Sequence, residues 1–199
     1  RLSSMECHDL MCFIGQIVVV GGVRRSAMIS LSNLSDDRMR HAKSGQWWET
    51  APHRALANNS VSYTEKPDIE TFMREWTALV ESKSGERGIF NREASKKQAE
   101  KYGRRDPNYE FGTNPCSEII LRPYQFCNLT EVVVRATDTI KDLERKVKIA
   151  TILGTIQSSY TKFPYLRKVW QRNTEEERLL GVSLTGIMDN QLMTTENHK

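Results

Sequence analysis

The residues best suited to chemistry lie in one short stretch, Asn114-Pro115-Cys116-Ser117-Glu118. It brings together an amide, a thiol and a carboxylate, which can supply a hydrogen bond, a sulfur-centred reaction and a proton transfer. In an extended segment side chains alternate between two faces, so this spacing predicts that Asn114, Cys116 and Glu118 point the same way. Taken alone, the stretch equally fits a buried cysteine in a strand, because cysteine is often only a small hydrophobic residue.

Helices and strands are expected to alternate along the chain that positions these residues. Hydrophobic spacing predicts helices over residues 3–16, 36–43, 67–82 and 91–102, and a further helix after Thr139-Ile-Lys-Asp142, which has the pattern of a capping box. Strands are expected over residues 28–31, 56–63, 116–121 and 128–134, and from Leu179 onward. This alternation predicts an α/β fold.

Two of these helices carry apolar residues that suggest a buried face. The helix over residues 3–16 is expected to bury its apolar residues, with Cys7 and Cys12 in or beside that core. The helix over residues 67–82 has apolar residues at helical spacing, a pattern typical of a helix that faces a core. The apolar residues are Met5, Leu10, Phe13 and Ile17 in the first helix and Ile69, Phe72, Met73, Trp76, Leu79 and Val80 in the second.

Composition excludes several classes of protein. The chain has 199 residues, of which 38% are hydrophobic and 27% charged, and it has no apolar run near the roughly 20 residues that span a bilayer. No signal-peptide pattern precedes the short apolar run over residues 13–20. The net charge of +4 is scattered, which favours anionic ligands such as nucleotides but not direct nucleic-acid binding. We therefore expect a cytoplasmic protein with no membrane partner.

Cysteine usage points to free thiols. The four cysteines form no Cys-x-x-Cys pair, and the four histidines complete no zinc pattern, so no metal site is predicted. A structural disulfide set is not expected in a chain of this size and composition, whereas reduced thiols fit a cytosolic protein.

Several motifs in order resemble the ribonucleotide reductases. The segment Phe111-Gly-Thr-Asn-Pro-Cys-Ser-Glu-Ile-Ile-Leu121, followed by Phe126-Cys-Asn-Leu-Thr-Glu-Val-Val-Val134, resembles their active-site segment, and most of all that of the adenosylcobalamin-dependent (class II) ribonucleoside-triphosphate reductases. Further matches begin at Gly21, Arg54, Gly88 and Glu175. The similarity extends from about residue 8 to about residue 190.

The resemblance implies a fold and a set of roles. The family fold is a ten-stranded α/β barrel with the active-site cysteine on an internal loop, and residues 1–199 are long enough for only part of that catalytic barrel, incomplete at both ends. Cys116 would carry a thiyl radical, Glu118 would be the general base, and Asn114 would hold the ribose hydroxyls. Cys127 would be one of two reducing thiols that become a disulfide. The family's partner thiol has no match here, and Ser117 stands where the family usually has glycine.

A second expected site is the loop that separates effector and substrate base in the family. By itself this stretch fits a surface arginine pair after a glycine turn, but beside the other motifs it is expected to be the specificity loop. Asn58, Asn59 and Ser60 either line the pocket or serve only as turn or strand residues. The loop residues are Gly21, Gly22, Val23, Arg24, Arg25, Ser26 and Ala27.

The resemblance also implies a reaction and its participants. We expect radical-based reduction of ribonucleotides to deoxyribonucleotides for DNA precursor synthesis, with adenosylcobalamin as cofactor. The expected partners are a ribonucleoside triphosphate, a deoxynucleotide effector and a thioredoxin-like or dithiol reductant, although diphosphate substrates stay open. This chain alone is expected to be inactive. Two alternatives stay open: a reductase with a different radical generator, and an inactive nucleotide-binding or regulatory remnant.

Overall fold

The computed structural model describes residues 1–18 and 26–195, which fall into two compact units. The first unit is Arg1–Pro123 and the second begins at Tyr124. Both contain parallel strands together with helices, so the predicted α/β class is confirmed. Within the described ranges no helix combines the length and the apolar character that crossing a membrane requires.

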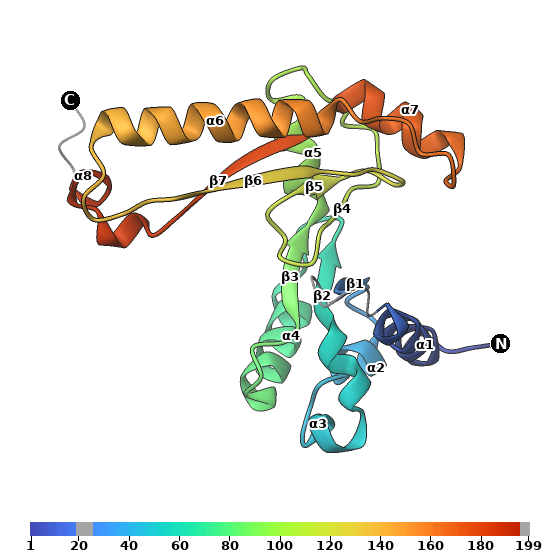
Figure 1. The fold of residues 1–199 in the computed structure, drawn as a ribbon. Coiled ribbons are helices and arrows are strands. Elements are labelled where there is room, and N and C mark those ends of the chain that lie inside the picture. Colours follow the sequence, from blue (N-terminus) through green and yellow to red (C-terminus); the bar gives the residue numbers. More distant parts are fainter. Residues whose placement is uncertain (19–25, 196–199) are drawn as a thin grey trace. The chain divides into compact units, whose positions relative to one another are not determined.

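The first unit contains a three-stranded parallel sheet in the order β1-β2-β3 (Figure 1). Its strands are β1 (Met28–Ser32), β2 (Ala57–Tyr63) and β3 (Gly88–Asn91), and Met28 lies opposite Ala57 in the register. Parallel neighbours need crossover connections. These are supplied by α2 (Asp37–Arg40), α3 (Trp47–Thr50) and the 3₁₀ turn η1 (Pro52–Leu56) before β2, and by α4 (Ile69–Ser82) before β3.

Helices α1 (Ser4–Ile17) and α5 (Arg92–Glu100) flank this sheet in the sequence. The side chain of Ser3 caps the start of α1, and the Glu6 carboxylate returns a hydrogen bond to the Ser3 amide at 2.7 Å. This reciprocal pair satisfies two amides that the first helical turn leaves unbonded. The helices predicted over residues 3–16, 67–82 and 91–102 are confirmed within a few residues.

The predicted buried face of α4 is wrong for four of its six apolar residues. Glu75 and Ala78 are buried and Phe72 and Leu79 are half-buried, whereas Ile69, Met73, Trp76 and Val80 are exposed. The physical reason is an ion-pair network, because both oxygens of Glu75 accept hydrogen bonds from guanidinium groups, those of Arg40 and Arg87. Pairing makes the burial of this carboxylate tolerable, so a charged residue occupies the buried face of the helix.

The predicted buried face of α1 is also wrong. His8 and Cys12 are buried, one turn apart, whereas Leu10, Phe13 and Ile17 are exposed, as is Cys7. Of the residues expected in or beside the core, Cys12 is buried and Met5 is half-buried. The buried side of α1 is thus formed by a polar and a small residue, while Leu10, Phe13 and Ile17 are exposed.

The chain then forms a short antiparallel pair, β4 (Gly112–Thr113) and β5 (Ile120–Leu121). Gly112 lies opposite Leu121 and Thr113 opposite Ile120. The strand predicted over residues 116–121 is therefore only its last two residues, because the preceding residues form a turn.

The second unit pairs β6 (Asn128–Val133) with β7 (Leu180–Thr185) in parallel. Helix α6 (Ile140–Ser158) connects them and runs along the pair (Figure 1). It begins at the predicted capping box, where Asp142 N–H donates to the Thr139 hydroxyl at 3.3 Å. The remaining elements are α7 (Lys168–Glu177), which was not predicted, the 3₁₀ turn η2 (Ile187–Asp189) and α8 (Gln191–Thr194).

Candidate active site around Cys116

Cys116 lies in a tight turn rather than in an extended segment. The Ser117 amide donates to the Asn114 carbonyl at 2.9 Å, and Ser117 has a φ of 66°. Pro115 occupies the second position of the turn, where its fixed φ is favoured. The expected alternation that would align Asn114, Cys116 and Glu118 is therefore wrong for this stretch.

The side chain of Asn114 closes the loop behind the cysteine. Its Oδ1 accepts hydrogen bonds from the Ile119 amide at 3.0 Å and from the Thr113 hydroxyl at 3.3 Å. The amide oxygen is thus occupied by the protein itself. Among the described residues its NH₂ group has no partner, so this half of the amide can donate to a ligand.

The reactive groups lie at the outside of this turn. Cys116, Ser117 and Glu118 are exposed, while Asn114 and Pro115 are half-buried. The turn therefore offers a thiol and a carboxylate to an incoming molecule and holds them by its backbone.

One contact from the sheet reaches the turn. The Asn58 Nδ2 donates to the Pro115 carbonyl oxygen at 2.6 Å. The sequence left open whether Asn58 lines the pocket or is only a turn or strand residue, and it did not predict this bond, because no periodic pattern joins residues so far apart in the chain.

The segment predicted to be the specificity loop, residues 21–27, falls largely outside the described residues. Gly21, Gly22, Val23, Arg24 and Arg25 are not described, whereas Ser26 and Ala27 are. These two residues line a cavity together with Asn58 and parts of α1 and η1. Asn58 thus lines this cavity and also contacts the cysteine turn, while Asn59 and Ser60 are buried strand residues.

An ion pair ties the Arg54 motif to α1. Arg54 Nε and Nη2 lie 2.7 and 2.6 Å from the two carboxylate oxygens of Asp9, and Arg54 Nη1 donates to the Ala42 carbonyl at 2.9 Å. His53 Nε2 lies 3.1 Å from Asp9. The hydrogen bonds from Arg54 hold the pKa of Asp9 well below its usual range. Arg54 therefore has a structural role just before β2.

Cys127 belongs to the second unit and immediately precedes β6. It is half-buried. Its neighbour Phe126 stacks near Phe163 and Trp170, with ring centroids 4.9 and 4.6 Å apart, and Asn128 donates to the Leu179 carbonyl at 3.1 Å. Aromatic packing on one side and strand pairing on the other thus fix the backbone around this thiol.

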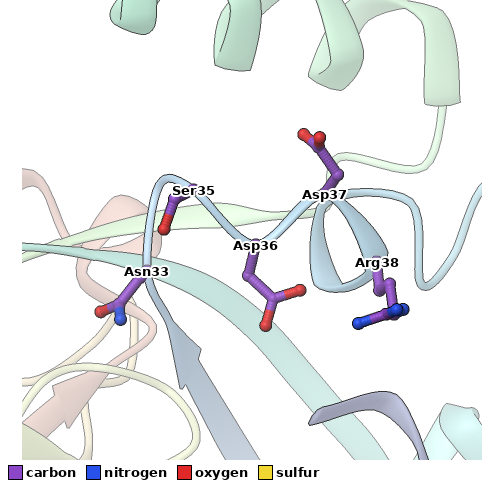
Figure 2. A pocket seen from close by; sticks show the side chains of 5 residues that line it. All are labelled: Asn33, Ser35, Asp36, Asp37 and Arg38. Carbon is purple, nitrogen blue, oxygen red and sulfur yellow. The ribbon is translucent and has the colours of Figure 1, made fainter. Parts of the chain in front are cut away.

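An open pocket after β1 contains none of the predicted site residues. Figure 2 shows its lining side chains, with Asp37 pointing away from the side on which Asp36 lies. Asp36 caps α2 through the Met39 amide at 3.1 Å, and Asp37 pairs with Arg40. Both carboxylates thus stabilise helix α2. Over the described ranges, no group of three or more histidine, cysteine or acidic residues is arranged to hold a metal.

The fold and the site together define an α/β protein that presents an exposed cysteine on a proline turn, held from a parallel sheet. Comparison with known proteins identifies what this arrangement is similar to. The chain is 34% identical over 95% of its length to the adenosylcobalamin-dependent ribonucleoside-triphosphate reductase of Lacticaseibacillus paracasei. The enzymes of the same name from Lactobacillus delbrueckii subsp. bulgaricus and Lactobacillus gasseri are 31% and 30% identical over 95% and 100% of this chain.

These similarities confirm the resemblance seen in the motifs. The chain spans about a quarter of the length of these relatives, 25% for the first two and 26% for the third. No family model and no solved structure matches the chain.

Proposed function

We propose that this chain carries the active-site cysteine segment of an adenosylcobalamin-dependent ribonucleoside-triphosphate reductase. The observation that supports this most is the exposed Cys116 on its turn, in a chain similar over 95% of its length to enzymes of that name. The activity converts a ribonucleotide to a 2′-deoxyribonucleotide.

Cys116 is the proposed radical carrier. The 2′-hydroxyl is a poor leaving group, and a thiyl radical at Cys116 makes its loss feasible by taking the hydrogen from C3′ of the ribose. Sulfur suits this step because S–H and C–H bonds have similar strengths. An exposed thiol at the outer side of a turn can approach a sugar carbon directly.

Glu118 and Asn114 would handle the ribose hydroxyls. Glu118 is exposed beside the thiol, and in this proposal it takes the proton of the 3′-hydroxyl as general base. Asn114 would donate through its amide NH₂ group, because its oxygen is bonded to the Ile119 amide.

Cys127 is the proposed source of reducing equivalents. Two thiols give two electrons and two protons and become a disulfide, and the substrate loses its 2′-hydroxyl as water. Cys127 would be one of these thiols, and a thioredoxin-like or dithiol reductant would restore it. The second thiol is not assigned.

The proposed cofactor fits the position of Cys116. Cys116 is exposed in this chain, so its thiol is open to a cofactor held by the rest of the complete protein. Radical chemistry is what adenosylcobalamin supplies when bound. The residues of this chain would present the S–H group and keep the sugar in reach.

The finer architecture and the regulation are part of the same proposal. The parallel strands with helical crossovers would form part of a ten-stranded barrel, with residues 1–199 as a partial catalytic domain. Residues 21–27 would relay a deoxynucleotide effector to the choice of substrate base.

The test uses the complete gene product that contains this chain, with adenosylcobalamin, a ribonucleoside triphosphate and a dithiol. We expect deoxynucleotide formation by the parent and by Cys7→Ser, a matched change at another exposed thiol. Cys116→Ser should give none, because a hydroxyl hydrogen is too strongly bound for oxygen to replace sulfur. Repeated turnover by Cys116→Ser would overturn the assignment, and an inactive parent would overturn the proposed activity.

A further inference from the structure

Among the described residues, three hydrogen bonds within the loop and one from outside it hold the turn that carries Cys116. The internal bonds are those of the Ser117 amide, the Ile119 amide and the Thr113 hydroxyl to Asn114. The external bond is from Asn58 Nδ2 to the Pro115 carbonyl at 2.6 Å. Asn58 is therefore the contact by which the sheet fixes the turn.

The bonded carbonyl belongs to the peptide group that joins Pro115 to Cys116. A peptide group is planar and rigid, so holding its oxygen sets the orientation of the Cys116 amide and of the bond to its Cα. The turn also contains Ser117 at a φ of 66°, a conformation that persists only where surrounding contacts enforce it. The direction in which the Cys116 side chain leaves the turn thus depends on Asn58.

The strand around Asn58 gives this contact a firm support. Asn58 lies opposite Ile29 in the pairing of β2 with β1. The amide of the next residue, Asn59, donates to Glu86 Oε2 at 2.7 Å, and Glu86 Oε1 lies 2.9 Å from the buried Lys43 Nζ. Lys43 also donates to the Ala57 carbonyl. The backbone is thereby pinned on both sides of Asn58.

We propose that Asn58 is a positioning residue for Cys116, which aims the thiol by holding the peptide group in front of it. The effect of Asn58 on catalysis rests on the proposed function, whereas the hydrogen bond from Asn58 to Pro115 is present in this chain by itself. A shift of about 1 Å in a reacting group can cost about 10²-fold in rate, so loss of the Asn58 side-chain amide can lower the turnover rate.

The first measurement is amide hydrogen exchange in the 199-residue chain. Asn58→Asp keeps the shape but removes the donor, and Asn58→Ala removes the whole amide. We expect exchange at Ser117 and Ile119 to become about fivefold faster, which corresponds to about 1 kcal/mol for one neutral hydrogen bond. The Phe72 amide, which donates to Asp68 at 3.0 Å in α4, reports whether the first unit stays folded.

The matched control is Asn128→Asp, which removes the same kind of amide-to-carbonyl bond in the second unit. It should leave exchange at Ser117 and Ile119 unchanged. Unchanged exchange in both Asn58 variants, with Phe72 still protected, would overturn the proposal.

The second measurement uses the complete gene product. Asn58→Asp should lower kcat with little change in the KM of the nucleotide. A raised KM with unchanged kcat would make Asn58 a binding residue and overturn the positioning role. If no variant and no parent forms deoxynucleotide, the proposed function fails, while hydrogen exchange still decides the Asn58 contact.

Discussion

Glu75 offers the sharpest test of what holds the first unit together. Its Oε2 accepts hydrogen bonds from Arg40 Nε at 2.9 Å and from Arg87 Nη2 at 2.7 Å, and its Oε1 accepts from Arg87 Nε. All three side chains are at least 95% buried. The network joins α2, α4 and the start of β3, so replacing Glu75 by glutamine should weaken three elements together.

The expected cost follows from leaving Arg87 buried without a counter-charge and Arg40 with only the exposed carboxylate of Asp37. Glutamine keeps the volume and one acceptor, but it turns an NH₂ group toward a cation. Removing one partner of a buried ion pair typically costs about 3–5 kcal/mol. The free energy of unfolding of a domain is typically about 5–15 kcal/mol, so Glu75→Gln should remove a large part of the stability of this unit.

Urea unfolding followed by tryptophan fluorescence measures this loss. All variants carry Trp170→Phe, which removes the tryptophan of the second unit. The remaining residues Trp47, Trp48 and Trp76 lie in the first unit, so the fluorescence reports its unfolding. With an m value of about 2 kcal/mol/M, Glu75→Gln should lower the midpoint by about 2 M.

The control is Glu70→Gln on the same helix, where an exposed carboxylate lies 3.3 Å from Arg74. Exposed pairs contribute about 0–1 kcal/mol, so this midpoint should move little. Equal midpoints for the Glu70 and Glu75 variants would refute the reasoning, since burial would then make no difference.

Three further outcomes follow. Burial alone would raise the pKa of Glu75, but hydrogen bonds from the arginines lower it, and the Arg54 hydrogen bonds lower that of Asp9. A carboxylate whose pKa is lowered in the folded state stabilises that state fully at pH values above its unfolded pKa of about 4, and this stabilisation is lost as the pH falls. The urea midpoint should therefore decrease when the pH is lowered below about 4, and the decrease should be smaller in Asp9→Asn. Ser117→Gly should slow exchange of the turn amides, because glycine adopts a φ of 66° without the steric cost of about 1 kcal/mol. Glu118→Gln in the complete gene product should lower kcat by about 10²–10⁴-fold with nucleotide binding retained, and a near-normal kcat would exclude the base role.

Local rules predicted the elements well. The capping box at Thr139 marks the start of α6, and apolar strand-like runs mark β1, β2 and β6 within a residue or two. These features depend on neighbours along the chain, so the sequence contains them directly.

Features that depend on distant partners were missed or misjudged. Apolar spacing placed the buried face of α4 on Ile69 and Met73, because nothing local reveals that Arg40 and Arg87 will meet Glu75. The bond from Asn58 to Pro115 joins strand β2 to a distant turn in the same way. For the candidate site, the sequence named the chemical groups, but the turn at Pro115 decided their orientation.

The exposed apolar residues of α1 and α4 have a practical consequence for work with this chain. Both helices expose large hydrophobic side chains to water: Leu10, Phe13 and Ile17 on α1, and Ile69 and Met73 on α4. Such surfaces attract each other and attract detergents and fluorescent hydrophobic dyes. We expect concentrated preparations to self-associate, with light scattering that rises with concentration and falls on addition of mild detergent. Dilute samples are therefore the right choice for the unfolding and exchange measurements.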